Sequence, residues 1–265
     1  MAGPQVARDD AERLTEGEQW SRDLLDRLRA RRFSASAWRD FFVDALHRSR
    51  VIRARRPDVT QQSRRWGAAG LAAALPFGPR PVVWWALWWA LIDWHLGMLE
   101  TPDGRPRPLR AHDALTLARL WAAPVARRHP EPWLVAAALA TDLADGVMAR
   151  RAGPTRLGRD FDSTADTFFL DQALRGLVER RGLDSALLTL ERARLTIGAA
   201  VVLAAYFGRS EPTPAMRNRE LGAVLAAAGL WLAAAGRPRV AERVMGAAIG
   251  YRALIRVRAK APAPV

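Results

Sequence analysis

The chain contains no cysteine, so disulfide bonds and thiolate metal sites are excluded. Its first residues lack an apolar core of the signal-peptide type, and we therefore expect no cleaved signal. The GxSxG and GxxxxGK(S/T) motifs are also absent, which excludes the nucleophile elbow and the phosphate loop that they build. Any catalytic chemistry must therefore use side chains other than cysteine and motifs other than these two.

Long apolar runs are scarce as well. Residues 1–65 are polar and charged, and the main apolar segments lie at 81–99, 133–140, 196–208 and 221–236. Most are shorter than the roughly 18–20 residues of an ideal membrane-spanning helix. Tilt, and burial of helices against each other, could accommodate the shortfall. We expect an all-α, polytopic membrane helical bundle, with a large soluble helical bundle as the alternative.

The charge that is present is mostly positive. The formal net charge is +14, carried almost wholly by arginine, which favours nucleic acid, an anionic membrane face or phosphorylated substrates as partners. Eleven tryptophans fit a membrane protein, because tryptophan is enriched at membrane–water interfaces. A basic DNA-binding helical protein would explain the charge but neither the apolar runs nor the carboxylates described below. We therefore expect no nucleic-acid partner.

The pattern divides the chain into four segments. Residues 1–65 form a polar N-terminal region of amphipathic helices, and 66–110 form an additional apolar helical hairpin with a linker. The hairpin breaks at PFGPRP, because proline removes a donor and glycine loosens the turn. Residues 111–258 form a six-helix core, and 259–265 are a C-terminal tail. The core helices are expected near 114–126, 132–149, 161–178, 184–207, 220–235 and 240–255.

Two helices are expected in the N-terminal region, at 9–32 and 36–54. The second places Trp38, Phe41 and Phe42 on one face and arginines on much of the other. That pattern suits a helix on an anionic membrane surface. It suits equally a helix packed on its own protein.

The arginines also predict an orientation. If the N-terminus is cytoplasmic and all eight apolar helices alternate, the loops that face the cytoplasm carry more arginine than the external ones, as the positive-inside rule requires. The expected location is thus the cell (inner) membrane, with residues 1–65 and the carboxylates of the next paragraph on the cytoplasmic side.

Four carboxylates stand out in TDLADGVMARRAGPTRLGRDFDSTADTFF, residues 141–169. Asp142 and Asp145 share one helix face, and Asp162 and Asp166 share another. If the two helices pack antiparallel, the four carboxylates meet and repel, and divalent cations relieve that conflict. Oxygen ligands without nearby histidine or cysteine indicate Mg²⁺, Mn²⁺ or Ca²⁺ rather than zinc.

The neighbours of these carboxylates suit a phosphate ligand. Gly146 and Ala149 would let a substrate approach the helix backbone, and Arg150 could grip a phosphate bidentately. Metal, arginine and carboxylate together are equipment for phosphoryl transfer.

Three other interpretations of these carboxylates differ in how well they fit the sequence. The DxDxT pattern at 160–164 would need a preceding strand, which RRAGPTRLGR does not supply. The acid pattern of an EF-hand is absent. A purely structural cluster of Asp–Arg salt bridges stays open.

The segment resembles the CDP-alcohol phosphatidyltransferase family, whose signature is D-x2-D-G-x2-A-R-x8-G-x3-D-x3-D. All eight signature residues are present, but seven residues rather than eight separate Arg150 from Gly158. A second motif of the family, N-x-(L/I)-T-x2-R, is similar to the stretch from Asp113 through Thr116 to Arg119, with aspartate in place of asparagine. The resemblance covers about 111–258.

The resemblance implies transfer of a phosphatidyl or similar group from a CDP-linked lipid such as CDP-diacylglycerol to an alcohol acceptor, with release of CMP, in phospholipid biosynthesis. It implies two Mg²⁺ or Mn²⁺ ions, with membrane lipids as further partners and a homodimer as a possible assembly. The residue roles that it implies are metal ligands at Asp142, Asp145, Asp162 and Asp166, the base at Asp166, and CDP contacts at Gly146, Ala149, Arg150, Gly158 and Thr116.

Two questions stay open at this stage. The shortened Arg150–Gly158 gap leaves room for a catalytically silent membrane-scaffold relative. The acceptor is also open, since glycerol 3-phosphate, phosphatidylglycerol, inositol phosphate and serine are all used within the family. Arg119, Arg192 and Arg194 could form a basic pocket for an acidic acceptor, or could pair with Asp171 or Glu191.

Overall fold

The computed structural model describes residues 15–101, 104–152, 156–208 and 219–260. Within these ranges the fold is all-α, as predicted, with short 3₁₀ turns η1 (Leu75–Phe77) and η2 (Leu96–Met98). The helices are α2 (Glu16–Ala30), α3 (Ala35–Arg55), α4 (Pro57–Ala74), α5 (Pro79–Trp94), α6 (Ala111–Arg128), α7 (Pro132–Ala152), α8 (Arg156–Arg181), α9 (Ser185–Gly208), α10 (Arg219–Ala234) and α11 (Pro238–Lys260).

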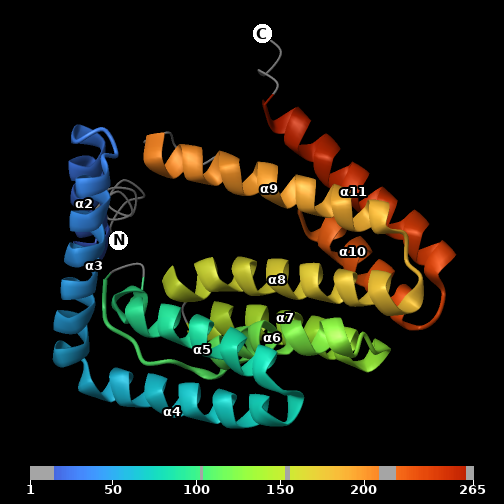
Figure 1. Ribbon diagram of the computed structural model, residues 1–265, viewed down its shortest axis with the longest axis horizontal. Coiled ribbons are helices and arrows are strands. Elements are labelled where there is room, and N and C mark those ends of the chain that lie inside the picture. Colours follow the sequence, from blue (N-terminus) through green and yellow to red (C-terminus); the bar gives the residue numbers. More distant parts are fainter. Residues whose placement is uncertain (1–14, 102–103, 153–155, 209–218, 261–265) are drawn as a thin grey trace, which may run out of the picture.

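The helices form a layered bundle with a hairpin across one end (Figure 1). Helices α4 to α8 run side by side, α9 passes over α8, and α10 and α11 pair beyond it. The α2–α3 hairpin stands across the end of these layers, where α9 finishes. The six predicted core helices are confirmed as α6 to α11.

The N-terminal hairpin follows its sequence signals closely. Thr15 caps α2, because its hydroxyl accepts from the Glu18 N–H at 3.3 Å while the Glu18 carboxylate accepts from the Thr15 N–H at 2.8 Å. The expected start at residue 9 lies outside the described residues. Helix α3 occupies the predicted 36–54 with one residue more at each end.

The predicted apolar hairpin is longer than expected at its start. Helix α4 begins at Pro57 rather than near residue 66, because proline is suited to the first helical turn and the polar residues after it continue the helix. The break at PFGPRP is confirmed as a 3₁₀ turn followed by Gly78. Gly78 has a φ of 90°, a conformation that favours glycine.

The aromatic face of α3 packs in part on the protein itself. The Trp38 ring lies 6.0 Å from that of Phe207 on α9, and the Trp94 indole N–H donates to the Ala45 carbonyl at 3.3 Å. Phe42 and Leu46 nevertheless stay exposed. The contacts with α9 and α5 therefore account for part of this face and leave another part open.

Tryptophan side chains join α4, α5 and α6. The indole N–H of Trp85 donates to the Gly67 carbonyl at 2.8 Å, and that of Trp121 donates to the Gly70 carbonyl at 3.1 Å. A Cβ atom added to Gly67 would lie 2.1 Å from the Trp89 ring, so the glycine makes room for that ring. These tryptophans have structural hydrogen bonds, beyond the interfacial role that the composition suggested.

Among the described residues, no helix combines the length and the apolar character that a membrane span requires. The polytopic arrangement therefore stays a prediction.

Helices α6 and α8 approach each other closely at Gly176. A Cβ atom added there would lie 2.5 Å from the Arg127 carbonyl oxygen and 2.8 Å from that of Ala126. Both obstacles are backbone atoms, which cannot turn aside as a side chain can. Because α8 also carries two of the candidate site residues, this contact helps to set their distance from α6.

We expect Gly176→Ala to destabilise the protein by about 1–3 kcal/mol, since an added methyl group would push α8 away from α6. The matched control is Gly246→Ala on α11, where an added Cβ would meet nothing within 4 Å. The control should be neutral or stabilising, because alanine has the higher helix propensity. Thermal melts of both variants check this, and equal melting temperatures would contradict the close approach.

Candidate metal and substrate site

Carboxylates from two helices converge on one arginine from a third. Helix α7 supplies Asp142, α8 supplies Asp162 and Asp166, and α6 supplies Arg119. One carboxylate oxygen from each of the three aspartates lies within 4.8 Å of the others. The predicted meeting of the aspartates is confirmed for these three. Helix α6 packs along both α7 and α8, so it forms the common support of the site.

Arg119 is the buried member of the group. Only 3% of the residue is exposed, whereas the three aspartate side chains are 41–45% exposed. Its Nη2 lies 3.7 Å from Asp142 Oδ1 and also contacts Asp162 Oδ1, and its Nε lies 3.0 Å from Asp166 Oδ1. The guanidinium thus lies beneath carboxylates that are accessible from solvent.

The donor set fits a hard divalent cation. Carboxylate oxygens are the ligands that Mg²⁺, Mn²⁺ and Ca²⁺ prefer, and the three aspartates offer one oxygen each at a spacing that an ion could bridge after small adjustments. Like charges this close repel, so the site requires a positive partner. Arg119 is one such positive partner, and a divalent metal ion is a second kind of positive partner that carboxylate chemistry allows.

A family model, CDP-alcohol phosphatidyltransferase, matches residues 113–255. The match begins in α6, ends in α11 and contains all of the residues that build the site. The chain belongs to the CDP-alcohol phosphatidyltransferase family. Members act on a CDP-alcohol and an acceptor alcohol, use divalent metal, and transfer a phosphate-linked group. Comparison with curated proteins and with solved structures gave no match.

Five residues of the family signature lie in helix segments whose side-chain surroundings are outside the described part of the structure. Asp145, Gly146, Ala149 and Arg150 belong to α7 and Gly158 to α8, but the structure describes only their helical backbone. The shortened gap between Arg150 and Gly158 includes residues 153–155, which are also outside it. The roles of these residues in metal and CDP binding stay predictions.

Thr116 lies one helical turn before Arg119 and is buried. Its hydroxyl donates to the His112 carbonyl at 3.4 Å, and with Leu157 and Phe161 it lines a small cavity between α6 and α8. Its role in CDP binding stays a prediction.

The aspartate that replaces the family's asparagine has a local role. The Asp113 carboxylate accepts from the Arg110 N–H at 2.8 Å, at the start of α6, and from the Arg107 guanidinium at 3.2 Å. The His112 ring lies 2.8 Å from Arg107 in the same buried group. The sequence carried a signal for the first contact, since an acidic residue at the third helical position commonly bonds back to the cap.

Arg192 and Arg194 each pair with an acidic side chain. Arg192 Nε lies 2.7 Å from Asp171 Oδ1, while Arg194 pairs with Glu191, whose carboxylate is also 3.5 Å from Arg252. The pairing alternative is therefore confirmed for both residues.

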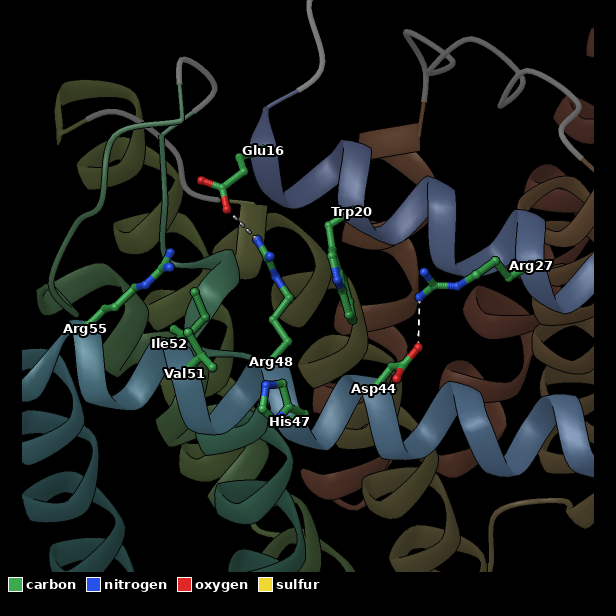
Figure 2. Close-up of a pocket in the computed structure, with 9 residues that line it drawn as sticks. All are labelled: Glu16, Trp20, Arg27, Asp44, His47, Arg48, Val51, Ile52 and Arg55. Atoms are coloured by element: carbon green, nitrogen blue, oxygen red, sulfur yellow. Dashed lines mark hydrogen bonds and ion pairs between the residues drawn. The ribbon is translucent and has the colours of Figure 1, made fainter.

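A larger cavity, about 350 Å³, lies outside the family match between α2 and α3 (Figure 2). Arg48 crosses it to pair with Glu16 at 3.3 Å and lies over the Trp20 ring, 4.8 Å from its centroid. At its other end Arg27 pairs with Asp44 at 2.9 Å. These ion pairs join the two helices across the cavity, and the site aspartates take no part in lining it.

Proposed function

We propose that the protein transfers a phosphatidyl group, or a similar substituted phosphate, from a CDP-linked lipid such as CDP-diacylglycerol to an alcohol acceptor and releases CMP, in phospholipid biosynthesis. The observation that carries this proposal is the convergence of Asp142, Asp162 and Asp166 inside the region that the family model matches. The exposure of the three carboxylates supports it, since substrate can approach them from solvent.

Asp166 is the residue proposed to act as base. Its carboxylate takes the proton of the acceptor hydroxyl, the acceptor oxygen bonds to the phosphorus that carries the lipid, and the bond from that phosphorus to the bridging oxygen breaks. The bridging oxygen keeps the electron pair and leaves with CMP. The exposed position of Asp166 on α8 supports this role, because a base must come within hydrogen-bond reach of the acceptor.

Asp142, Asp145, Asp162 and Asp166 are proposed to hold two Mg²⁺ or Mn²⁺ ions. A divalent cation bound there would offset charge on the diphosphate and on the departing CMP. The positions of the carboxylates determine where the cations would bind. The ion pairs with Arg119 hold the carboxylates of Asp142, Asp162 and Asp166 at the junction of α6, α7 and α8.

A catalytically silent scaffold is the second candidate function. Arg119 lies within ion-pair distance of the three aspartates, and a positive side chain in this position favours a site that can persist without turnover. Release of CMP distinguishes the two functions directly.

The proposed location is the cell membrane, with the site on the cytoplasmic side. Apolar side chains that are more than half exposed support it: Val83 and Leu87 on α5, Ile197 on α9 and Val224 on α10. Val83 and Leu87 lie one turn apart on one face, so they extend an apolar surface that water does not favour.

We expect the purified protein to release CMP from CDP-diacylglycerol when an acceptor alcohol and Mg²⁺ are present, and to lose this activity after EDTA treatment and dialysis. Glycerol 3-phosphate, phosphatidylglycerol, inositol phosphate and serine are the acceptors to supply in parallel, with CMP measured by chromatography. Re-addition of Mg²⁺ or Mn²⁺ should restore the rate. Undiminished release after chelation would contradict a role for metal, and no release with any acceptor would favour the silent scaffold.

Asp166→Asn is expected to lower the rate of CMP release by about 10²–10⁴-fold, the usual cost of losing a general base. The matched control is Asp171→Asn, on the same helix and ion-paired with Arg192 away from the site. Rates and CDP-lipid affinity are measured together at saturating Mg²⁺. Near-normal turnover of Asp166→Asn would exclude Asp166 as the base. Asp145→Asn removes the charge of a proposed metal ligand and should weaken CDP-lipid binding, so an equal loss of affinity in Asp166→Asn would make Asp166 chiefly a ligand.

We expect the protein to sediment with membranes after cell breakage and to resist extraction by high salt and by alkaline carbonate, because exposed apolar side chains rather than charges would hold it there. Detergent should release it. Recovery in the supernatant without detergent would contradict the membrane location while leaving the chemistry of the site untouched.

A further inference from the structure

Arg119 meets the same three carboxylates that the proposed metal site would use. Two of its nitrogens are within ion-pair distance of Asp162 and Asp166, and Asp142 Oδ1 lies 3.7 Å from Nη2. A divalent cation bound by these carboxylates would lie close to a guanidinium that is already their partner. Two positive groups would then share one set of negative charges.

We infer that Arg119 is the internal counter-cation of the metal-free site and that it opposes binding of the divalent cation. In the metal-free protein its positive charge holds the three carboxylates together. When metal arrives, part of the attraction between metal and carboxylates is offset by repulsion from the guanidinium. This inference rests on the proposed function for the nature of the metal site, and it concerns the arginine rather than the ligands.

Burial makes this antagonism strong. Arg119 is 3% exposed and arginine does not lose its proton in proteins, so its charge can neither be titrated away nor be screened by much water. Repulsion between cations a few ångströms apart is larger near a protein surface than in bulk water, although solvent at the exposed carboxylates screens part of it. The surrounding helices also restrict how far the guanidinium can retreat, because α6 packs along both α7 and α8.

The inference has a signature that distinguishes it from an ordinary structural role. Without the positive charge, the metal-free site has three adjacent carboxylates that repel, so the protein should be less stable. The same change removes the repulsion that opposes metal, so metal should bind more tightly. A residue that only supports the fold would lower the stability with and without metal, and would not raise the affinity.

Arg127 provides a matched control. It lies on α6 as well, and it pairs with Glu179 of α8 through Nε at 3.2 Å and Nη2 at 2.7 Å. Both arginines thus join the same two helices by an ion pair, but Arg127 pairs away from the aspartate cluster. The Arg127→Gln variant removes an arginine from α6 without changing the charge at the site.

The test measures Mn²⁺ binding by electron paramagnetic resonance of the free ion, together with thermal melts with and without Mn²⁺. We expect Arg119→Gln to melt at a lower temperature than wild type without metal and to bind Mn²⁺ about tenfold more tightly, the scale of one charge-assisted interaction. Arg119→Lys keeps the charge and should stay close to wild type. Arg127→Gln should leave the Mn²⁺ affinity unchanged.

The remaining outcomes each support or overturn the inference about Arg119. If Arg119→Gln is unfolded without metal, Mn²⁺ should restore its helical circular dichroism, and failure to do so would overturn the inference. If Arg119→Gln is folded and binds Mn²⁺ no more tightly than wild type, the inference is overturned. Binding of Mn²⁺ by wild type would still support the proposed metal site. Binding by the variant but not by wild type would support it in its strongest form. If neither protein binds Mn²⁺, the inference and the metal role in the proposed function both fail.

Discussion

Like charges held close together need a positive partner, and the centre of this protein is arranged around that need. One carboxylate oxygen from each of Asp142, Asp162 and Asp166 lies within 4.8 Å of the others, and their mutual repulsion opposes this arrangement unless it is compensated. Arg119 supplies the compensation from beneath, while the outer sides of the carboxylates stay open. The salt-bridge cluster therefore uses the same carboxylates as the proposed site, so the two interpretations do not exclude each other.

The position of α6 makes this arrangement possible. Ala126 and Leu174 belong to the core that α6 shares with α8, and both are fully buried. Gly176 lets the backbones of the two helices approach at the end of that contact. Because α6 also packs along α7, a single helix can present Arg119 to carboxylates from both neighbours. The site is thus supported by rigid helices rather than by loops, which favours a fixed geometry.

The residues before the family match support α6 from its other side. Trp84 donates its indole N–H to the Leu120 carbonyl at 2.9 Å, and Trp85 and Leu117 belong to a second apolar cluster that also includes Leu157 of α8. Glu100 in the linker is buried and accepts from the Thr15 hydroxyl at 3.0 Å, and this burial raises the pKa of its carboxyl group. The N-terminal region is consequently part of the same packed structure as the family core.

Periodicity and proline positions predicted nearly all of the helices, because they depend on the chain's local chemistry. The least accurate boundary was the start of α4, where polar residues after Pro57 carry no apolar signal but still form a helix. The sequence also determined which aspartates share a helix face and that their oxygens suit a hard cation. Both follow from spacing within one or two neighbouring helices and from the ligand type.

Only the tertiary structure decided which cation meets those aspartates. Arg119 lies 43 positions before Asp162 along the chain, and although it ends a motif of the family, that motif does not say which carboxylates it meets. Arg192 pairs with Asp171 instead. An arginine side chain is long and can turn to several partners, so its choice depends on how the helices pack around it. That packing places α6 along both α7 and α8, and it is a property of the whole bundle that no single stretch of sequence carries.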